Sequence, residues 1–265
     1  MKRECGRITK KQYLGDHSLT EYVIEPGTIW VEDWAFAYCS HLERIAFPET
    51  VAGIGKALFL GCVALNTVYF YDSRAQSGRF LFEEAEKEQR LEGELYALAF
   101  RYFNDADALI RAHYGRDKKL IETWEVLFDK FLSTPEEDGF EPFLAGGEED
   151  YEGAEEAALS YCHGMRLKKT EAILQRMLWG KLSGEGETKA YLHYQKKLQE
   201  AQEAYEVLGN VEQFYQQAID IYEEAGFLDS VHIEKLLEAV SPQKAELRGM
   251  IIKRAQGNLF DRFVL

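Results

Sequence analysis

Apolar residues recur along the first third of the chain at a fixed spacing of 23 residues. The segments DHSLTEYVI (16–24), CSHLERIAF (39–47) and CVALNTVYF (62–70) align without gaps. Five apolar columns hold through these segments and the residues before them: Leu19/Leu42/Leu65, Tyr22/Ile45/Val68, Ile24/Phe47/Phe70, Tyr13/Phe36/Phe59 and Ile8/Val31/Ile54. Such a period predicts a repeat architecture in which neighbouring units stack and share one apolar core.

Within each unit, alternate residues of a short strand are predicted to face the core, followed by a turn and a second extended piece. The residues between the inward positions then form columns on the outer face of a sheet: Glu21/Arg44/Thr67 and Val23/Ala46/Tyr69. Because adjacent strands lie about 4.8 Å apart, Glu21 and Arg44 are placed to form a surface ion pair.

The segment FPETVAGIGKALFLGCVALNTVYF (47–70) resembles the BspA-type bacterial leucine-rich repeat, whose pattern runs Ile-Pro-x-x-Val-x-x-Ile-Gly-x-x-Ala-Phe-x-x-Cys-x-x-Leu-x-x-Ile. The preceding copy, residues 24–47, keeps the Ala-Phe, Cys, Leu and Ile positions but has Glu32 where the pattern expects Gly. The resemblance covers about residues 1–72. It implies a curved solenoid that acts as a binding or surface-display scaffold, and it implies no catalytic chemistry.

From about Phe80 the apolar spacing becomes helical, with steps of three and four residues. One series predicts a single charged helix across five positions: Tyr194, Leu198, Ala201, Tyr205 and Leu208. Asp229 is placed to cap a later helix. The expected fold class is therefore α+β: a short leucine-rich-repeat solenoid of about three 23-residue turns in residues 1–75, followed by an all-α helical domain of six to eight helices in residues 80–265.

Residues 135–156 contain ten acidic side chains, no Lys or Arg, and four glycines. This composition predicts a solvated acidic loop. A calcium site is the functional alternative, but EEDYEGAEE lacks the ordered oxygen ligands of a calcium loop.

Net charge and hydropathy exclude two classes of partner. The formal charge of −15 comes entirely from the residues after 80, because residues 1–80 carry nine basic and nine acidic side chains. An acidic surface repels phosphate backbones, so we expect no nucleic-acid partner. The N-terminus lacks the apolar run of a signal peptide, and the chain has no apolar stretch of about 20 residues. We therefore expect a cytoplasmic protein without a membrane partner, or a surface or secreted one if a leader has been removed.

No catalytic motif is recognisable in the sequence. VAGIGKALFLGC (51–62) has glycines and a lysine, but their spacing is not that of a phosphate-binding loop, and Lys56 is followed by Ala57. The repeat instead accounts for this stretch. Cys39 and Cys62 are predicted to be small buried hydrophobes on adjacent units, and the six histidines form no known ligand motif. We expect no cofactor and no metal.

Two functions remain, and the preferred one is a non-catalytic protein-interaction module. Outward columns and aromatic residues supply its predicted contacts: Glu21, Arg44, Thr67, Tyr69, Tyr71, Trp30 and Trp34. The alternative is an enzyme or regulator with a site in a cleft between repeats and helices, using Glu94, Asp105, Asp107 and His113. We also expect that the uncapped edge of the first repeat allows self-association.

Overall fold

A computed structural model describes residues 6–71, 87–103, 106, 109, 120–138, 140, 151–184, 188–211 and 214–263 of the chain. Backbone contacts divide the chain into two compact units, Met1–Ser133 and Thr134–Leu265. Six strands and two helices are described in the first unit, and six helices in the second. The sequence placed a boundary earlier, at residues 75–80, because the change of hydrophobic period lies there.

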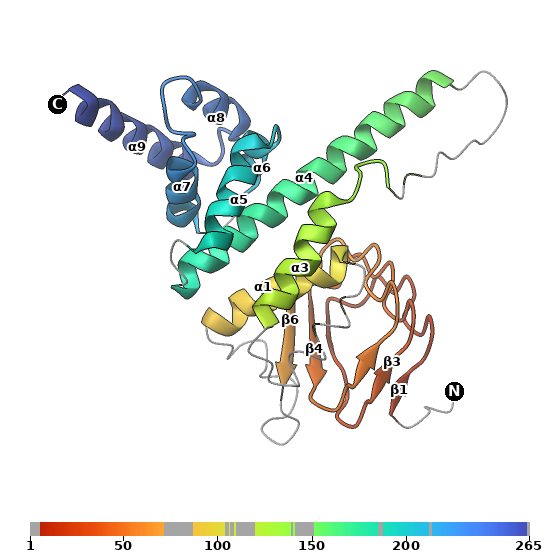
Figure 1. Cartoon of the computed structure of the whole chain (residues 1–265). Coiled ribbons are helices and arrows are strands. Elements are labelled where there is room, and N and C mark those ends of the chain that lie inside the picture. The colour runs from red at the N-terminus through yellow and green to blue at the C-terminus, as the bar shows by residue number, and fades with distance from the viewer. Residues whose placement is uncertain are drawn as a thin grey trace. The chain divides into compact units, whose positions relative to one another are not determined.

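The strands of the first unit form two parallel three-stranded sheets (Figure 1). One sheet contains β1 (Arg7–Ile8), β3 (Trp30–Val31) and β5 (Gly53–Ile54), and the other contains β2 (Glu21–Val23), β4 (Arg44–Pro48) and β6 (Thr67–Tyr71). Each strand pairs with the strand 23 residues further on, so the period read from the sequence is the step of the strand register. We call each unit a rung; the first two rungs are residues 7–29 and 30–52, and the third is described over residues 53–71.

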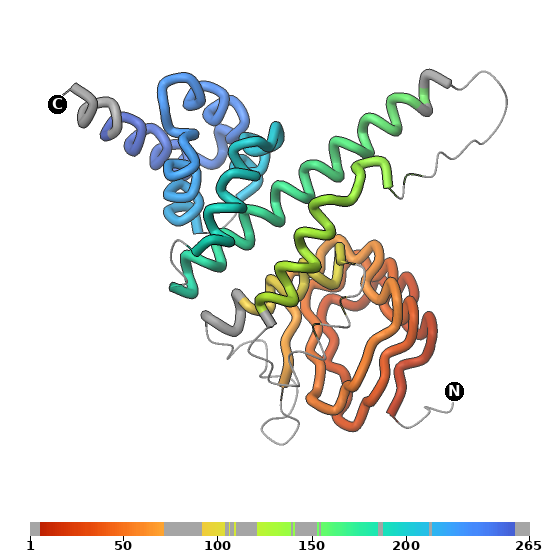
Figure 2. Tube along the Cα trace, in the orientation of Figure 1, coloured from red at the N-terminus to blue at the C-terminus, as the bar shows by residue number. Residues whose placement is uncertain are grey.

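The backbone of successive rungs follows the same path (Figure 2), and equivalent side chains stack between them. The rings of Tyr13 and Phe36 stack with centroids 5.1 Å apart, and those of Phe36 and Phe59 with centroids 5.8 Å apart. Phe36 has no exposed surface. The aromatic column predicted from the sequence is therefore a continuous stack through the core of the three rungs.

Two other columns have left-handed backbone, in the segments that connect the two sheets. Their φ angles are positive at every rung: 59°, 60° and 50° at Lys11, Trp34 and Ala57, and 69°, 61° and 73° at Gly15, Tyr38 and Gly61. Glycine at position 61 also makes room for the ring of Tyr38, since a Cβ there would lie 2.6 Å from that ring. The chain thus turns the same way at each rung, whichever residue occupies the position.

Helix α1 (Lys87–Tyr102) packs against β6, the last strand of its sheet. A Cβ on Gly93 would lie 2.6 Å from Cγ2 of Thr67, so glycine permits this close approach. The ring of Phe100 lies 5.8 Å from that of Phe59, which extends the aromatic stack into the helix. A helix therefore covers the strand edge that would otherwise follow the third rung.

Helix α3 (Leu120–Ser133) completes the first unit by packing on α1. The Trp124 indole N–H donates to the carbonyl of Leu95 at 3.0 Å. Phe103 meets the ring of Trp124 edge to face and stacks on the ring of Phe128. The indole therefore buries its apolar body and still satisfies its one polar atom.

The second unit contains α4 (Tyr151–Ser183), α5 (Lys189–Glu200), α6 (Ala204–Asn210), α7 (Tyr215–Glu224), α8 (Ile233–Ala239) and α9 (Ala245–Phe263). The prediction of one helix from Tyr194 to Leu208 was wrong, because α5 ends and α6 begins within that range. Ala201 adopts an extended conformation (φ −78°, ψ 124°), and the buried Glu203 accepts a hydrogen bond from Arg166 of α4 at 2.7 Å. This contact between distant residues fixes the break.

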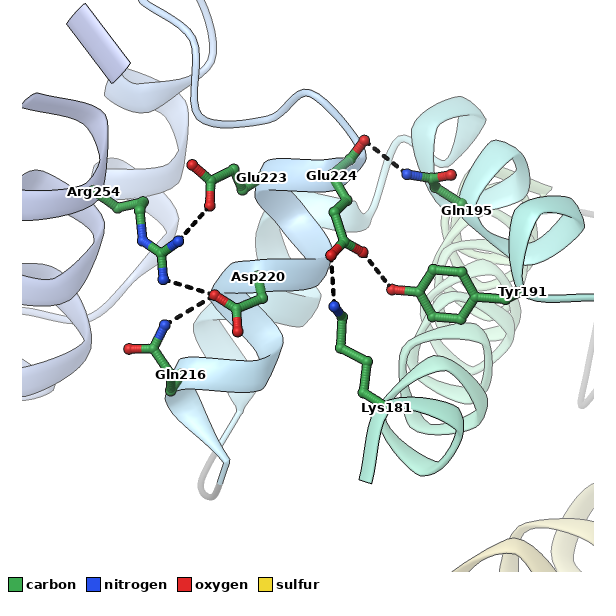
Figure 3. A network of polar contacts seen from close by, with 8 residues as sticks. All are labelled: Lys181, Tyr191, Gln195, Gln216, Asp220, Glu223, Glu224 and Arg254. Carbon is green, nitrogen blue, oxygen red and sulfur yellow. Dashed lines mark hydrogen bonds and ion pairs between the residues drawn. The ribbon is translucent and has the colours of Figure 1, made fainter. Parts of the chain in front are cut away.

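One side of α7 is joined to α4 and α5 through Glu224 (Figure 3). Lys181 Nζ lies 2.6 Å from one carboxylate oxygen of Glu224, and the Tyr191 hydroxyl donates to the other at 2.7 Å. The side-chain amide of Gln195 donates to the backbone carbonyl of the same residue at 2.7 Å. Glu224 therefore holds three helices together.

The other side of α7 is joined to α9 through Arg254 (Figure 3). Its guanidinium donates to Asp220 at 2.7 Å and to Glu223 at 2.6 Å. Gln216 donates to the same Asp220 at 2.9 Å. A planar guanidinium that bridges two carboxylates restricts the orientation of α9 more than a single ion pair would.

The start of the predicted acidic loop is attached to α4. Arg166 pairs with Glu136 at 3.0 Å, and the Tyr161 hydroxyl donates to the carbonyl of Asp138 at 2.8 Å. Residues 141–150 lie outside the described residues. Residues 151–156, which were predicted to be loop, belong to α4, so that part of the prediction was wrong.

Asp229 lies in the turn before α8 and accepts hydrogen bonds from the backbone N–H groups of Val231 and His232, both at 3.0 Å. Burial opposes ionisation of this carboxyl, but the hydrogen bonds from His232 and Val231 outweigh it and lower the pKa of Asp229. Asp229 therefore stabilises the turn that leads into α8, but the residue directly before the helix is His232, which forms no side-chain capping hydrogen bond, so the predicted capping role of Asp229 is not confirmed.

Candidate interaction surface

The outer face of the β2–β4–β6 sheet carries the predicted polar column. Glu21, Arg44 and Thr67 lie side by side in register, and the carboxylate of Glu21 forms an ion pair with the guanidinium of Arg44. Both charged side chains are partly exposed, so the pair contributes at most about 1 kcal/mol to stability. The predicted contact between these two residues is confirmed.

Two residues predicted as exposed contacts on this sheet are buried instead. Thr67 is 8% exposed and packs against Gly93 of α1. Tyr71 is 7% exposed, and its hydroxyl donates to the carbonyl of Ile24, two strands away. Burial raises the pKa of Tyr71 to about 12. The alternating pattern of the strand predicted that both side chains point outward. It could not show that α1 packs over Thr67, or that the side chain of Tyr71 lies across its own sheet.

The remaining aromatic candidates retain exposed surface. Tyr69 is half-buried beside Ala46 and Val23. Trp30 is 41% exposed and lies over Gly53 of the next rung, where a Cβ would lie 2.4 Å from its ring. Trp34 is half-buried on the connecting segment with left-handed backbone. Tyr69 and Trp30 lie on different sheets, and Trp34 lies on a connecting segment. Strand register therefore does not bring these three aromatic residues into one patch.

A second group of exposed apolar side chains lies on the connecting segments of the rungs. We call it the turn surface; its members are Leu14 (42% exposed), Tyr38 (50%), Leu60 (41%) and Val63 (75%). Tyr38 N donates to the carbonyl of Leu60 at 2.6 Å, and Gly15 N donates to the carbonyl of Ala37 at 2.9 Å. These bonds join the three rungs where the apolar side chains emerge.

The turn surface was not predicted from the sequence, because the predicted contacts were outward strand positions and tryptophans. The signal was present in the same period, since Leu14 and Leu60 occupy one column and Tyr38 lies in the next. A buried alanine occupies the second-rung position of the first column. Large apolar residues at exposed column positions therefore indicated a surface feature that the core pattern does not require.

Cys39 and Cys62 are buried, as predicted. Cys39 Sγ donates to the carbonyl of Tyr13 and Cys62 Sγ to that of Phe36, both at 3.0 Å. Burial raises the pKa of Cys62 to about 12, so its reactive thiolate form is suppressed at neutral pH. Lys56, the residue that raised the possibility of a phosphate loop, has its backbone N–H bound to the Asp33 carboxylate at 2.8 Å.

The groups of the enzyme alternative are only partly described. Burial raises the pKa of Glu94, on α1, to about 7. Asp105, Asp107 and His113 lie outside the described residues. Among the residues that the structure describes, no group of three or more His, Cys, Asp or Glu side chains is arranged to hold a metal ion. The enzyme alternative stays an untested prediction.

None of the described helices contains an apolar stretch of the length that a membrane span requires.

A comparison with protein-family models matches residues 6–107 to the BspA type leucine rich repeat region, in six copies. This confirms the resemblance seen in the sequence and extends it past residue 72 to include α1. Neither curated proteins nor solved structures give a match to the chain.

Proposed function

We propose that this chain, whose residues 6–107 are a BspA-type leucine-rich-repeat region, is a non-catalytic protein-interaction module. In this proposal the repeats form a short solenoid, and the turn surface is its principal contact with a partner protein. The observation that carries the proposal is the exposure of Leu14, Tyr38 and Leu60 in two neighbouring columns of three stacked rungs.

The composition of the turn surface supports a protein partner. Tyrosine offers a large rigid contact area at low entropic cost and is enriched among the residues that dominate binding energy. The backbone beneath these side chains is fixed by hydrogen bonds between rungs, so little conformational entropy remains to be lost on binding. A partner that presents apolar side chains fits this chemistry.

The β2–β4–β6 face supports the proposal less well. Thr67 and Tyr71 are buried there, and Glu21 and Arg44 already neutralise each other. An exposed ion pair at an interface contributes more to association rate and specificity than to affinity. We therefore assign this face a secondary role.

Crosslinking in cell extracts, followed by quantitative mass spectrometry, tests the assignment with a double variant, Tyr38→Asn/Leu60→Asn. Asparagine tolerates the positive φ of position 38, so this variant keeps the backbone while removing apolar surface. We expect the main captured protein to be reduced at least about tenfold, because losing two central contacts costs about 1.4 kcal/mol or more.

Leu192→Asn is the matched control, since Leu192 is a 49% exposed leucine on α5 in the second unit. Circular dichroism checks that both variants are folded. Equal capture by wild type and the double variant contradicts the turn-surface assignment. Equal loss in Leu192→Asn shows that capture depends on general hydrophobicity, which contradicts it as well.

Self-association through the first rung stays a separate prediction. Within the described residues, β1 and β2 are the terminal strands of their sheets, and such edges pair readily with other chains. Light scattering over a range of concentrations measures the mass directly. A single monomer mass throughout contradicts this prediction and leaves the turn-surface proposal intact.

A further inference from the structure

Two histidines of adjacent rungs lie together on the connecting segments. His17 belongs to the first rung and His41 to the second, and both side chains are exposed. Their ring centroids are 5.9 Å apart. They are 24 residues apart in sequence, one repeat period plus one residue, which is why the six histidines looked scattered when the sequence was read linearly.

A hydrogen bond at Nδ1 of each ring bears on which nitrogen can bind a ligand. His41 Nδ1 lies 2.8 Å from the backbone carbonyl of His17. A carbonyl only accepts, so Nδ1 of His41 carries the proton, and the neutral ring presents the lone pair of Nε2. His17 Nδ1 lies 2.9 Å from the hydroxyl of Ser40, which can hold this ring in the same tautomer.

A backbone carbonyl or hydroxyl behind the other ring nitrogen is the usual arrangement of a histidine that binds a metal. Metal–nitrogen distances are about 2.0–2.1 Å, which places each ring centroid roughly 3 Å from the ion. One ion bound at the tetrahedral angle holds two such centroids roughly 5 Å apart, so the observed separation of 5.9 Å requires the two exposed rings to approach by roughly 1 Å when the ion binds.

We propose that His17 and His41 bind one divalent first-row transition-metal ion of the kind that favours imidazole, such as Zn²⁺, through their Nε2 atoms. The described residues offer no third protein ligand, so water completes the coordination. The site links the first and second rungs beside the turn surface, and it does not depend on the proposed partner. It differs from our expectation from sequence that the chain has no metal site.

Titration of the full chain, purified without a histidine tag, with Zn²⁺ by calorimetry tests this proposal. We expect one equivalent to bind, and affinity to fall at least about tenfold in His17→Gln and in His41→Gln. Proton NMR of the imidazole signals gives a second readout: Zn²⁺ should shift the resonances of these two histidines. Ser40→Ala should weaken binding without abolishing the shifts, and Ser40→Thr should restore it, because Ser40 only positions His17.

His193→Gln is the control variant, since His193 is an exposed histidine on α5. Mg²⁺ is the control ion, because it prefers oxygen ligands and reports general attraction to an acidic surface. Unchanged Zn²⁺ affinity in His17→Gln/His41→Gln overturns the proposal. So does an equal loss in His193→Gln, or competition by Mg²⁺ at the same concentration. Circular dichroism confirms that each variant is folded.

Discussion

The repeats and the helical unit are stabilised by different kinds of contact. In the repeats the same bond recurs at each step: Cys39 Sγ donates to the carbonyl of Tyr13, and Cys62 Sγ donates to that of Phe36, both at 3.0 Å. In the second unit, by contrast, the pairing of Arg166 with Glu203 does not belong to a sequence repeat. A translational pattern can be read from one sequence, whereas a contact that occurs once cannot.

The two regions also differ in how changes should spread. In the repeats, each core side chain packs against the equivalent side chains of the rungs before and after it. Truncating a side chain in the middle rung therefore weakens the packing with both neighbouring rungs. Polar side chains such as Glu224 and Arg254 instead connect particular helices of the second unit. We therefore expect the largest losses of stability in the middle of the stack and smaller ones at the charged contacts.

Phe36→Ala should produce the largest effect. Phe36 is fully buried between Tyr13 and Phe59, and its truncation leaves a cavity that touches all three rungs. Loss of a buried phenylalanine costs about 3–5 kcal/mol. Hydrogen exchange should show faster exchange of the amides in all three rungs. Val63→Ala, at a 75% exposed position, is the control and should change little. Faster exchange confined to the second rung alone would contradict a shared core.

The repeat region was largely predictable from the sequence. The period placed Glu21 beside Arg44, aligned the strands and buried Phe36, because the same residue types recur in each rung. Exposure was less predictable. Tyr71 occupies an outward position but lies folded over its own sheet, since its hydroxyl reaches a carbonyl two strands away. An outward direction along a strand does not show what later covers the face.

The pH dependence of the first unit tests whether α1 is an integral part of the repeat stack. Burial raises the pKa of Glu94 from 4.5 to about 7. The folded chain therefore binds this proton more tightly than the unfolded chain does. The resulting stabilisation is fully present below about pH 4.5 and is lost as the pH rises through about 7.

Glu94→Gln removes this dependence, since glutamine stays neutral. Urea unfolding should give similar stabilities for both proteins near pH 4.5. By about pH 8 the variant should be more stable by up to about 3 kcal/mol, at 1.36 kcal/mol for each pKa unit. A constant difference at all pH values would show that the carboxylate is not buried in solution.

Arg166→Ala probes the second unit, where we expect a smaller loss. The guanidinium donates to Glu203 at 2.7 Å and to Glu136 at 3.0 Å, and its removal leaves the buried Glu203 without this partner. We expect a loss of about 1–2 kcal/mol by thermal unfolding. Lys196→Ala is the control, since Lys196 is 75% exposed and its pair with Glu200, at 3.8 Å, contributes little. Equal effects of the two variants would contradict the role of burial.

For the helical unit, the sequence predicted that helices form but not where each one ends. Helical spacing identified Tyr194 and Leu198 as buried positions, but not the break at Ala201. The contact that fixes the break joins Glu203 to Arg166 of α4, 37 residues away in sequence. The proposed metal-binding pair, His17 and His41, was less predictable than the repeat core and more predictable than the helix break. Their proximity follows from the repeat period, and only the assumption that ligands must be close in sequence concealed it.

The smallest expected effect tests whether the connecting segments follow backbone geometry more than residue type. Ala57 has φ of 50° on an exposed segment, in the column shared with Lys11 and Trp34. An L-residue in the left-handed region costs about 1–2 kcal/mol, and glycine avoids that cost while adding about 0.5–1 kcal/mol of unfolded-state entropy. Ala57→Gly should therefore stabilise the repeats by about 0.5–1 kcal/mol in urea unfolding. Ala52→Gly, at an exposed alanine outside the set of positive-φ residues, should destabilise them by a similar amount. If both changes have the same sign, side-chain contacts rather than the repeated backbone turn determine these segments.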